Sequence, residues 1–134
     1  MSEVFAWPVR VYYEDTDVGG VVYYANYLRF MERARTEYLR AKGFEQDALM
    51  AQEGVIFVVV QAEVTFRKPA RFNDMLAVTV SIDDSTRTSV RFGQHVYRDS
   101  VDGELLVEGS IRGACLDVNS FRPRAIPTAI VENT

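Results

Sequence analysis

The order of periodic segments along the chain constrains its fold more than any other feature of the sequence. Residues 26–42 carry apolar side chains at helical spacing, with Phe30, Ala34 and Tyr38 on one stripe and most charged residues on the other side. Four long segments of alternating apolar and polar residues follow, and no second long helical pattern interrupts them. A lone helix with one apolar face must bury that face against the sheet that these strands form.

The alternating segments predict an antiparallel sheet. A first strand rich in Val and Tyr is expected at residues 7–13, and the later strands at residues 58–66, 76–83, 90–97 and 104–117. Strands of this length exceed the usual five or six residues or so, which favours a curved sheet wrapped around the helix. We therefore predict an α+β fold whose open sheet edge pairs with a second copy of the chain.

Short-range signals mark the ends and irregularities of these elements. Asn26 is predicted to be the N-cap of the helix, and Gly43 the glycine just beyond its C-terminus. Gly109 and Gly113 are predicted to be bend or bulge positions in the last strand. The tail, residues 121–131, is expected to lie over the surface.

Composition restricts the class of protein. A chain of 134 residues is expected to form one domain, residues 1–134, and its 48% apolar and 25% charged residues are typical of a soluble protein. The net charge of -4 disfavours nucleic-acid binding, because such domains usually carry a basic face. The longest apolar run, Val55 to Val60, is far shorter than the roughly 20 residues of a membrane helix. Since the single cysteine, Cys115, cannot form an internal disulfide, we expect a cytoplasmic protein.

One short segment combines the groups that acyl-transfer chemistry needs. A strand-like run ends in the acidic residues Asp15 and Asp17, the pair Gly19-Gly20 follows, and the long helix then begins. A carboxylate, a flexible backbone and the N–H groups of a helix N-terminus can together hold a reacting carbonyl beside a base. Spacing alone leaves open whether Asp17 is catalytic or a turn carboxylate that accepts nearby N–H groups. Asp15 is interpreted as a turn residue.

Residues 10–27 read Arg-Val-Tyr-Tyr-Glu-Asp-Thr-Asp-Val-Gly-Gly-Val-Val-Tyr-Tyr-Ala-Asn-Tyr, and residues 31–37 read Met-Glu-Arg-Ala-Arg-Thr-Glu. Together with residues 69–75, 87–89 and 122–127, they resemble the hotdog-fold acyl-CoA thioesterases of the 4-hydroxybenzoyl-CoA thioesterase family, closest to its YbgC-like subgroup associated with the Tol-Pal system. The resemblance runs through nearly the whole chain. It implies a five-stranded antiparallel sheet around one long helix, homodimers that pair into homotetramers, and hydrolysis of acyl-CoA to free acid and CoA without a cofactor, because coenzyme A is part of the substrate.

The same resemblance implies roles for residues of the acidic turn. Asp17 takes the position of the catalytic carboxylate, either as a general base for water or as a nucleophile. Tyr24 stands where YbgC-like members commonly have His, which leaves the preferred acyl group open. We expect the peptide N–H of Tyr24 to polarise the thioester oxygen. Gly20 and Asn26 are expected to contribute further substrate contacts, although Asn26 fits a helix cap better than a catalytic amide.

Basic residues are expected to hold the phosphates of CoA. Arg87 is the first candidate, because it falls where the aromatic-thioesterase branch of the family has a phosphate-binding arginine. Arg122 and Arg124 in the tail are weaker candidates. A basic loop, residues 67–71, is a further possibility, although loop cations are more often solvated.

The remaining chemistry-bearing residues suggest no other site. His95, the only histidine, is interpreted as structural or interfacial, and Cys115 as a small buried side chain. No metal-ligand spacing and no phosphate-binding glycine motif occurs. Two alternatives stay open: a dehydratase on the same fold, which is expected to need a His-plus-acid pair, and a scaffold that binds CoA or an acyl carrier without turnover.

Overall fold

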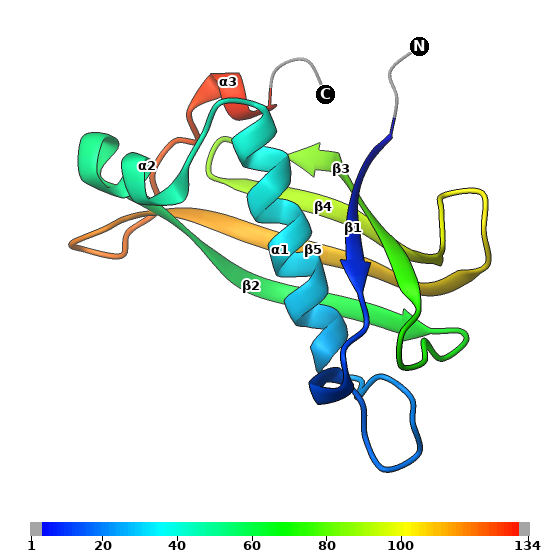
Figure 1. Cartoon of the computed structure of the whole chain (residues 1–134). Coiled ribbons are helices and arrows are strands. Elements are labelled where there is room, and N and C mark those ends of the chain that lie inside the picture. Colours follow the sequence, from blue (N-terminus) through cyan, green and yellow to red (C-terminus); the bar gives the residue numbers. More distant parts are fainter. Residues whose placement is uncertain (1–3, 132–134) are drawn as a thin grey trace.

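The computed structural model describes residues 4–131 and consists of a curved antiparallel sheet with one long helix lying across its concave face (Figure 1). The sheet order is β1-β3-β4-β5-β2, and the strands span β1 Phe5–Arg10, β2 Val55–Phe66, β3 Met75–Ser85, β4 Ser89–Arg98 and β5 Leu105–Asp117. Every neighbouring pair is antiparallel. The predicted α+β fold, a five-stranded antiparallel sheet around one long helix, is therefore confirmed.

The long helix α1, Asn26–Ala41, buries the stripe that the sequence predicts. Phe30 and Ala34 are fully buried and Tyr38 nearly so. Its C-terminus is closed as predicted by Gly43, which has φ +94° and donates its N–H to Arg40 O at 2.9 Å, while the Phe44 N–H reaches Leu39 O at 2.9 Å. These two bonds form a Schellman motif, which needs a residue with positive φ.

The first strand differs from its predicted bounds. β1 ends at Arg10, and Tyr13–Asp15 form a 3-10 turn rather than a continuation of the strand. The Asp15 side chain causes the difference, because its Oδ2 accepts the Tyr12 N–H at 2.8 Å and its own N–H reaches Tyr12 O at 3.0 Å. Such local side-chain bonds compete with strand pairing.

Of the two β5 glycines predicted to be bend or bulge positions, Gly113 lies opposite a bulge and Gly109 has another role. A Cβ at Gly109 would come within 2.8 Å of the Met31 side chain, so this glycine lets α1 approach the sheet. The bulge lies in β2 instead, between Val59 and Gln61, opposite Gly113. Because β2 forms one edge of the sheet, its exposed residues 59–63 leave a strand edge without a neighbour within the described chain.

The two ends of α1 carry different segments (Figure 1). The loop from β1 and the β2–β3 loop lie at its N-terminal end, whereas α2 (Gln46–Glu53), α3 (Thr128–Val131) and the β3–β4 hairpin lie toward its C-terminal end. The tail was expected to lie over the surface, but it also adds to the core, since Ile126 and Ile130 are buried. None of the helices described between residues 4 and 131 is long and apolar enough to cross a membrane.

Candidate active site

Asp17 opens a tight turn before α1. Its carbonyl accepts the Gly20 N–H at 3.0 Å, and its N–H reaches Val21 O at 3.0 Å, so residues 17–21 form a small hairpin. Gly20 has φ +78°, a conformation that glycine adopts at little cost. The Asp17 Oδ1 accepts the Gly19 N–H at 2.8 Å, whereas Oδ2 has no hydrogen-bond partner within residues 4–131. One carboxylate oxygen is thus fixed and the other is available.

The turn borders an open hollow of about 730 Å³. Asp17, Gly20 and Val18 line one side of it, and Tyr13 and Phe72 contribute aromatic rings whose centroids are 5.6 Å apart. The Asp17 carboxylate is exposed in the single chain. The hollow therefore offers an apolar wall beside an accessible carboxylate.

Tyr24 lies at the start of α1 and lines a neighbouring hollow with Phe66. The peptide N–H groups of Tyr24 and Ala25 make no hydrogen bond within residues 4–131. Free N–H groups at a helix N-terminus favour negative charge. The Tyr24 side chain is 61% exposed, and its ring lies 4.8 Å from that of Tyr23. A side-chain hydrogen bond with Tyr24 is the main cause of the raised pKa of Tyr23.

Asn26 is not the predicted N-cap. It is the first residue of α1, after the cap residue Ala25, and its side-chain amide donates to Asp15 O at 2.9 Å. The same carbonyl accepts the Tyr23 N–H at 3.0 Å. The prediction that Asp15 is a turn residue is confirmed, and Asn26 ties this turn to the helix.

The β2–β3 loop supports the Asp17 turn from the side. The Val22 N–H donates to Ala70 O at 2.9 Å, and the Ala70 N–H donates to the Tyr27 hydroxyl at 3.0 Å. Tyr27 is buried, which raises the pKa of its phenol. The turn, this loop and the first turn of α1 are therefore linked by hydrogen bonds.

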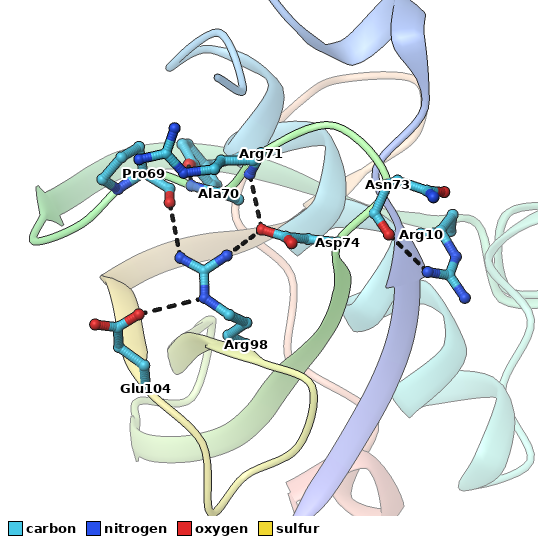
Figure 2. Close-up of polar contacts among 9 residues, drawn as sticks. Arg10, Pro69, Ala70, Arg71, Asn73, Asp74, Arg98 and Glu104 are labelled. Atoms are coloured by element: carbon cyan, nitrogen blue, oxygen red, sulfur yellow. Dashed lines mark hydrogen bonds and ion pairs between the residues drawn. The ribbon is translucent and has the colours of Figure 1, made fainter. Parts of the chain in front are cut away.

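Arg98 anchors the β2–β3 loop, as Figure 2 shows. Its guanidinium pairs with the Asp74 carboxylate, donates to Pro69 O at 3.0 Å, and contacts Glu104 Oε1 at 3.3 Å. Asp74 also accepts the Arg71 N–H at 2.8 Å. The ion pairs with Lys68 and Arg98 lower the pKa of Glu104. Sequence reasoning missed Arg98, because an arginine at the end of a strand carries no pattern that separates it from a solvated one.

The arginines predicted to bind phosphate lie toward the other end of α1 from the Asp17 turn in the same chain. Arg87 O accepts the Ile126 N–H at 2.9 Å, and Arg122 O accepts the Asp117 N–H at 2.8 Å. Arg124 donates to Asp117 Oδ2 at 2.9 Å and to the carbonyl of Glu53, the last residue of α2, at 3.2 Å. The structure therefore brings the three arginines to one end and does not join them to Asp17 within a single chain.

The basic loop lies near Tyr24 but is largely paired. Arg67 Nε contacts Glu108 Oε2 at 2.6 Å, and Lys68 Nζ contacts Glu104 Oε2 at 2.9 Å. Both side chains line the hollow that contains Tyr24. The positive charges of Arg67 and Lys68 are thus partly neutralised by the two glutamates.

The other residues behave as structural groups. His95 is on the outer face of β4, where its ring stacks on Tyr97 and its Nε2 lies 3.7 Å from Glu108 Oε1. It is not part of the Asp17 site, which disfavours a His-plus-acid dehydratase. Cys115 is buried, as predicted, and burial raises the pKa of its thiol. Residues 4–131 contain no cluster of side chains suited to a metal ion.

Comparison with known proteins assigns the family. Residues 11–134 match the thioesterase-like superfamily. The chain belongs to that superfamily. It is 48% identical to the acyl-CoA thioester hydrolase YbgC of Escherichia coli O6:H1, over 97% of this chain and 95% of the relative.

Solved structures agree with this assignment. A probable thioesterase from Bartonella henselae superimposes with a TM-score of 0.86 at 32% identity, covering 93% of this chain and all of the other. A gentisyl-coenzyme A thioesterase superimposes with a TM-score of 0.84 at 25% identity, covering 94% of this chain and 98% of the other. The prediction of a hotdog-fold thioesterase is confirmed.

Proposed function

We propose that the chain hydrolyses short-chain or aromatic acyl-CoA thioesters to a free acid and CoA, with Asp17 as the reacting carboxylate. The observation that carries the proposal is that one short segment, residues 17–25, holds both an accessible carboxylate oxygen and free N–H groups at the start of α1. Membership of the thioesterase-like superfamily supports the reaction class. No cofactor is required, because CoA is part of the substrate.

Two routes use the same contacts. As a base, Asp17 takes a proton from water, whose oxygen bonds to the acyl carbon while the carbon–sulfur bond breaks. As a nucleophile, a carboxylate oxygen attacks that carbon and expels CoA thiolate, and water then cleaves the mixed anhydride and regenerates Asp17. In both routes the Tyr24 N–H donates to the developing oxyanion.

A second copy of the chain completes the site. The exposed stretch of β2, residues 59–63, is an open edge that pairs with the same strand of another copy. Antiparallel pairing sets the first half of one β2 beside the last half of the other. Arg124 contacts Glu53, just before the start of β2, whereas Tyr24 contacts Phe66 at the end of β2. In the antiparallel pair, the start of one β2 lies beside the end of the other, so the arginines of one copy approach Tyr24 of the other.

This arrangement supports Arg87, Arg122 and Arg124 as phosphate ligands contributed by the second copy, with Gly20 and Asn26 shaping the Asp17 side of the site. Two such dimers pair into a homotetramer.

We assign the protein to the cytoplasm, because its single cysteine calls for no oxidising compartment.

A thiol-release assay tests the proposal. The purified protein is offered a panel of acyl-CoAs, and kcat/KM is compared between the wild type and Asp17→Asn, with Asp102→Asn in the β4–β5 hairpin as the matched control. We expect Asp17→Asn to lose about 100-fold or more and Asp102→Asn to lose nothing. Equal values for the wild type and Asp17→Asn would remove Asp17 from catalysis. Binding without thiol release would favour the scaffold alternative.

A further inference from the structure

A second cavity lies between α1 and the first half of β2. Its volume is about 190 Å³, room on the order of six water molecules. Its apolar walls include Leu39, Phe57, Phe92 and Ile111, and its polar lining residues are Glu32, Arg35, Thr36 and Gln46. The Asp17 turn and Tyr24 are not among its lining residues. A cavity with apolar walls and an arginine is suited to a ligand with an apolar body and an anionic end.

Arg35 has no hydrogen-bonded carboxylate among residues 4–131, and the charge of Glu32 acts on it only from a distance. Its Nη1 donates to Gln94 Oε1 at 2.9 Å, and it forms no ion pair within residues 4–131. Gln94 is fully buried and donates from Nε2 to Met31 O at 3.0 Å, so its position is fixed between the sheet and α1. Burial lowers the pKa of Arg35.

The acidic neighbour of Arg35 lines the same cavity but forms no ion pair with it. Glu32, one turn earlier on α1, is exposed and accepts the Thr36 hydroxyl at 3.2 Å. By contrast, Arg40 on the same helix pairs with both Glu37 and Glu45. A guanidinium that is largely withdrawn from water gains most from a carboxylate, which it can bind with two parallel N–H···O bonds.

In the dimer proposed above, on which this step rests, the cavity lies beside the thioester site of the second copy. Its β2 residues, Phe57 to Val59, belong to the first half of the strand, whereas Tyr24 contacts Phe66 at the end of the strand. Antiparallel pairing of two β2 strands places these halves side by side. An acyl group whose carbonyl lies at Tyr24 of one copy can therefore extend toward Arg35 of the other.

We propose that this cavity receives the far end of the acyl group and that Arg35 selects acyl-CoA thioesters whose far end carries a carboxylate. The inference rests on the proposed function, since it assumes that the thioester is cleaved at Asp17. The Glu32 carboxylate, which also lines the cavity, repels a carboxylate at the end of the acyl group. The preference for such acyl groups therefore depends on Arg35 and is weakened by Glu32.

The test compares adipoyl-CoA with heptanoyl-CoA, in which a terminal methyl group takes the place of one carboxylate oxygen, so that the two acyl groups are of similar length and differ in charge. We expect Arg35→Met to lower the ratio of kcat/KM, adipoyl over heptanoyl, by about 10- to 100-fold, as for a lost charged hydrogen bond. Glu32→Gln is expected to raise the ratio. Arg33→Met, on the exposed side of the same helix, is expected to leave it unchanged.

A binding measurement separates this proposal from the catalytic one. Calorimetric titration of Asp17→Asn with both ligands, with and without Arg35→Met, reports recognition in the absence of turnover. We expect the added Arg35→Met change to weaken adipoyl-CoA binding at least about tenfold more than heptanoyl-CoA binding. An unchanged ratio of affinities in folded Arg35→Met protein, or a preference for adipoyl-CoA that survives the change, overturns the role of Arg35. Failure of hydrolysis alone overturns only the role of Asp17.

Discussion

Arg98 and Asp74 form a half-buried ion pair that links the end of β4 to the start of β3 (Figure 2). Because Arg98 also donates to Pro69 O, this single guanidinium closes the β2–β3 loop from both sides. The loop in turn accepts the Val22 N–H beside the Asp17 turn. The position of the reacting carboxylate therefore depends on a residue that does not line the hollow around it.

Replacement of Arg98 by Met is expected to destabilise the protein by about 2–3 kcal/mol, because Asp74 loses its cation and Pro69 O loses its side-chain donor. Arg91→Met is the matched control, since Arg91 only approaches the exposed Asp84 at 4.0 Å and should change stability by no more than about 0.5 kcal/mol. Urea denaturation measures both variants. Equal stability losses would show that the Arg98 contacts contribute no more than a surface pair.

Replacement of Tyr24 by Phe is expected to leave kcat/KM within about tenfold of the wild type, because the proposed oxyanion donor is the peptide N–H and it survives the change. The variant removes the neighbouring hydroxyl that raises the pKa of Tyr23, so this pKa should fall back toward its ordinary value. Thiol release measures the activity, and ultraviolet titration measures the phenol. A loss as large as that of Asp17→Asn would assign the chemistry to the hydroxyl instead.

Replacement of Val60 by Lys is expected to dissociate the proposed dimer. Val60 is 57% exposed at the bulge of the edge strand β2, and a charge there opposes pairing of two copies. Light scattering after size-exclusion chromatography gives the mass, with Val101→Lys in the β4–β5 hairpin as the control. Thiol release should fall together with the mass, because each site draws residues from both copies. A dimeric, fully active Val60→Lys protein would contradict pairing through β2.

Acid stability is expected to depend on Asp117. Its carboxylate accepts the Ser120 and Asn119 N–H groups at 2.9 Å and also pairs with Arg124, and these contacts hold its pKa below the ordinary value of 3.8. A depressed pKa in the folded state adds stability above about pH 4, and this contribution disappears as the pH falls through the folded value. The wild type should therefore lose its stability advantage over Asp117→Asn as the pH falls from about 4 through the lowered pKa of Asp117. A constant difference in unfolding free energy across that range would refute the linkage.

Much of the candidate site was predictable from local sequence. The acidic turn, the Gly19-Gly20 pair and the helix start are neighbours in the chain, so their contacts follow from a few backbone bonds. The prediction of Asn26 as an N-cap is wrong, because its amide reaches back to Asp15 O, which the turn brings near. The predicted roles of Asp17, Tyr24 and the three arginines stay predictions for the experiments above.

The sequence by itself determined the α+β class, the buried stripe of α1 and the acidic turn, because periodicity and turn chemistry are local properties. Only the tertiary structure decided that Arg98 supports the β2–β3 loop, that Gly109 leaves room for the Met31 side chain, and that Arg35 lines a cavity with Glu32 and apolar residues without forming an ion pair within residues 4–131. These contacts join residues far apart in the chain. Which distant side chains meet depends on how the sheet curves around the helix, and no local pattern encodes that curvature.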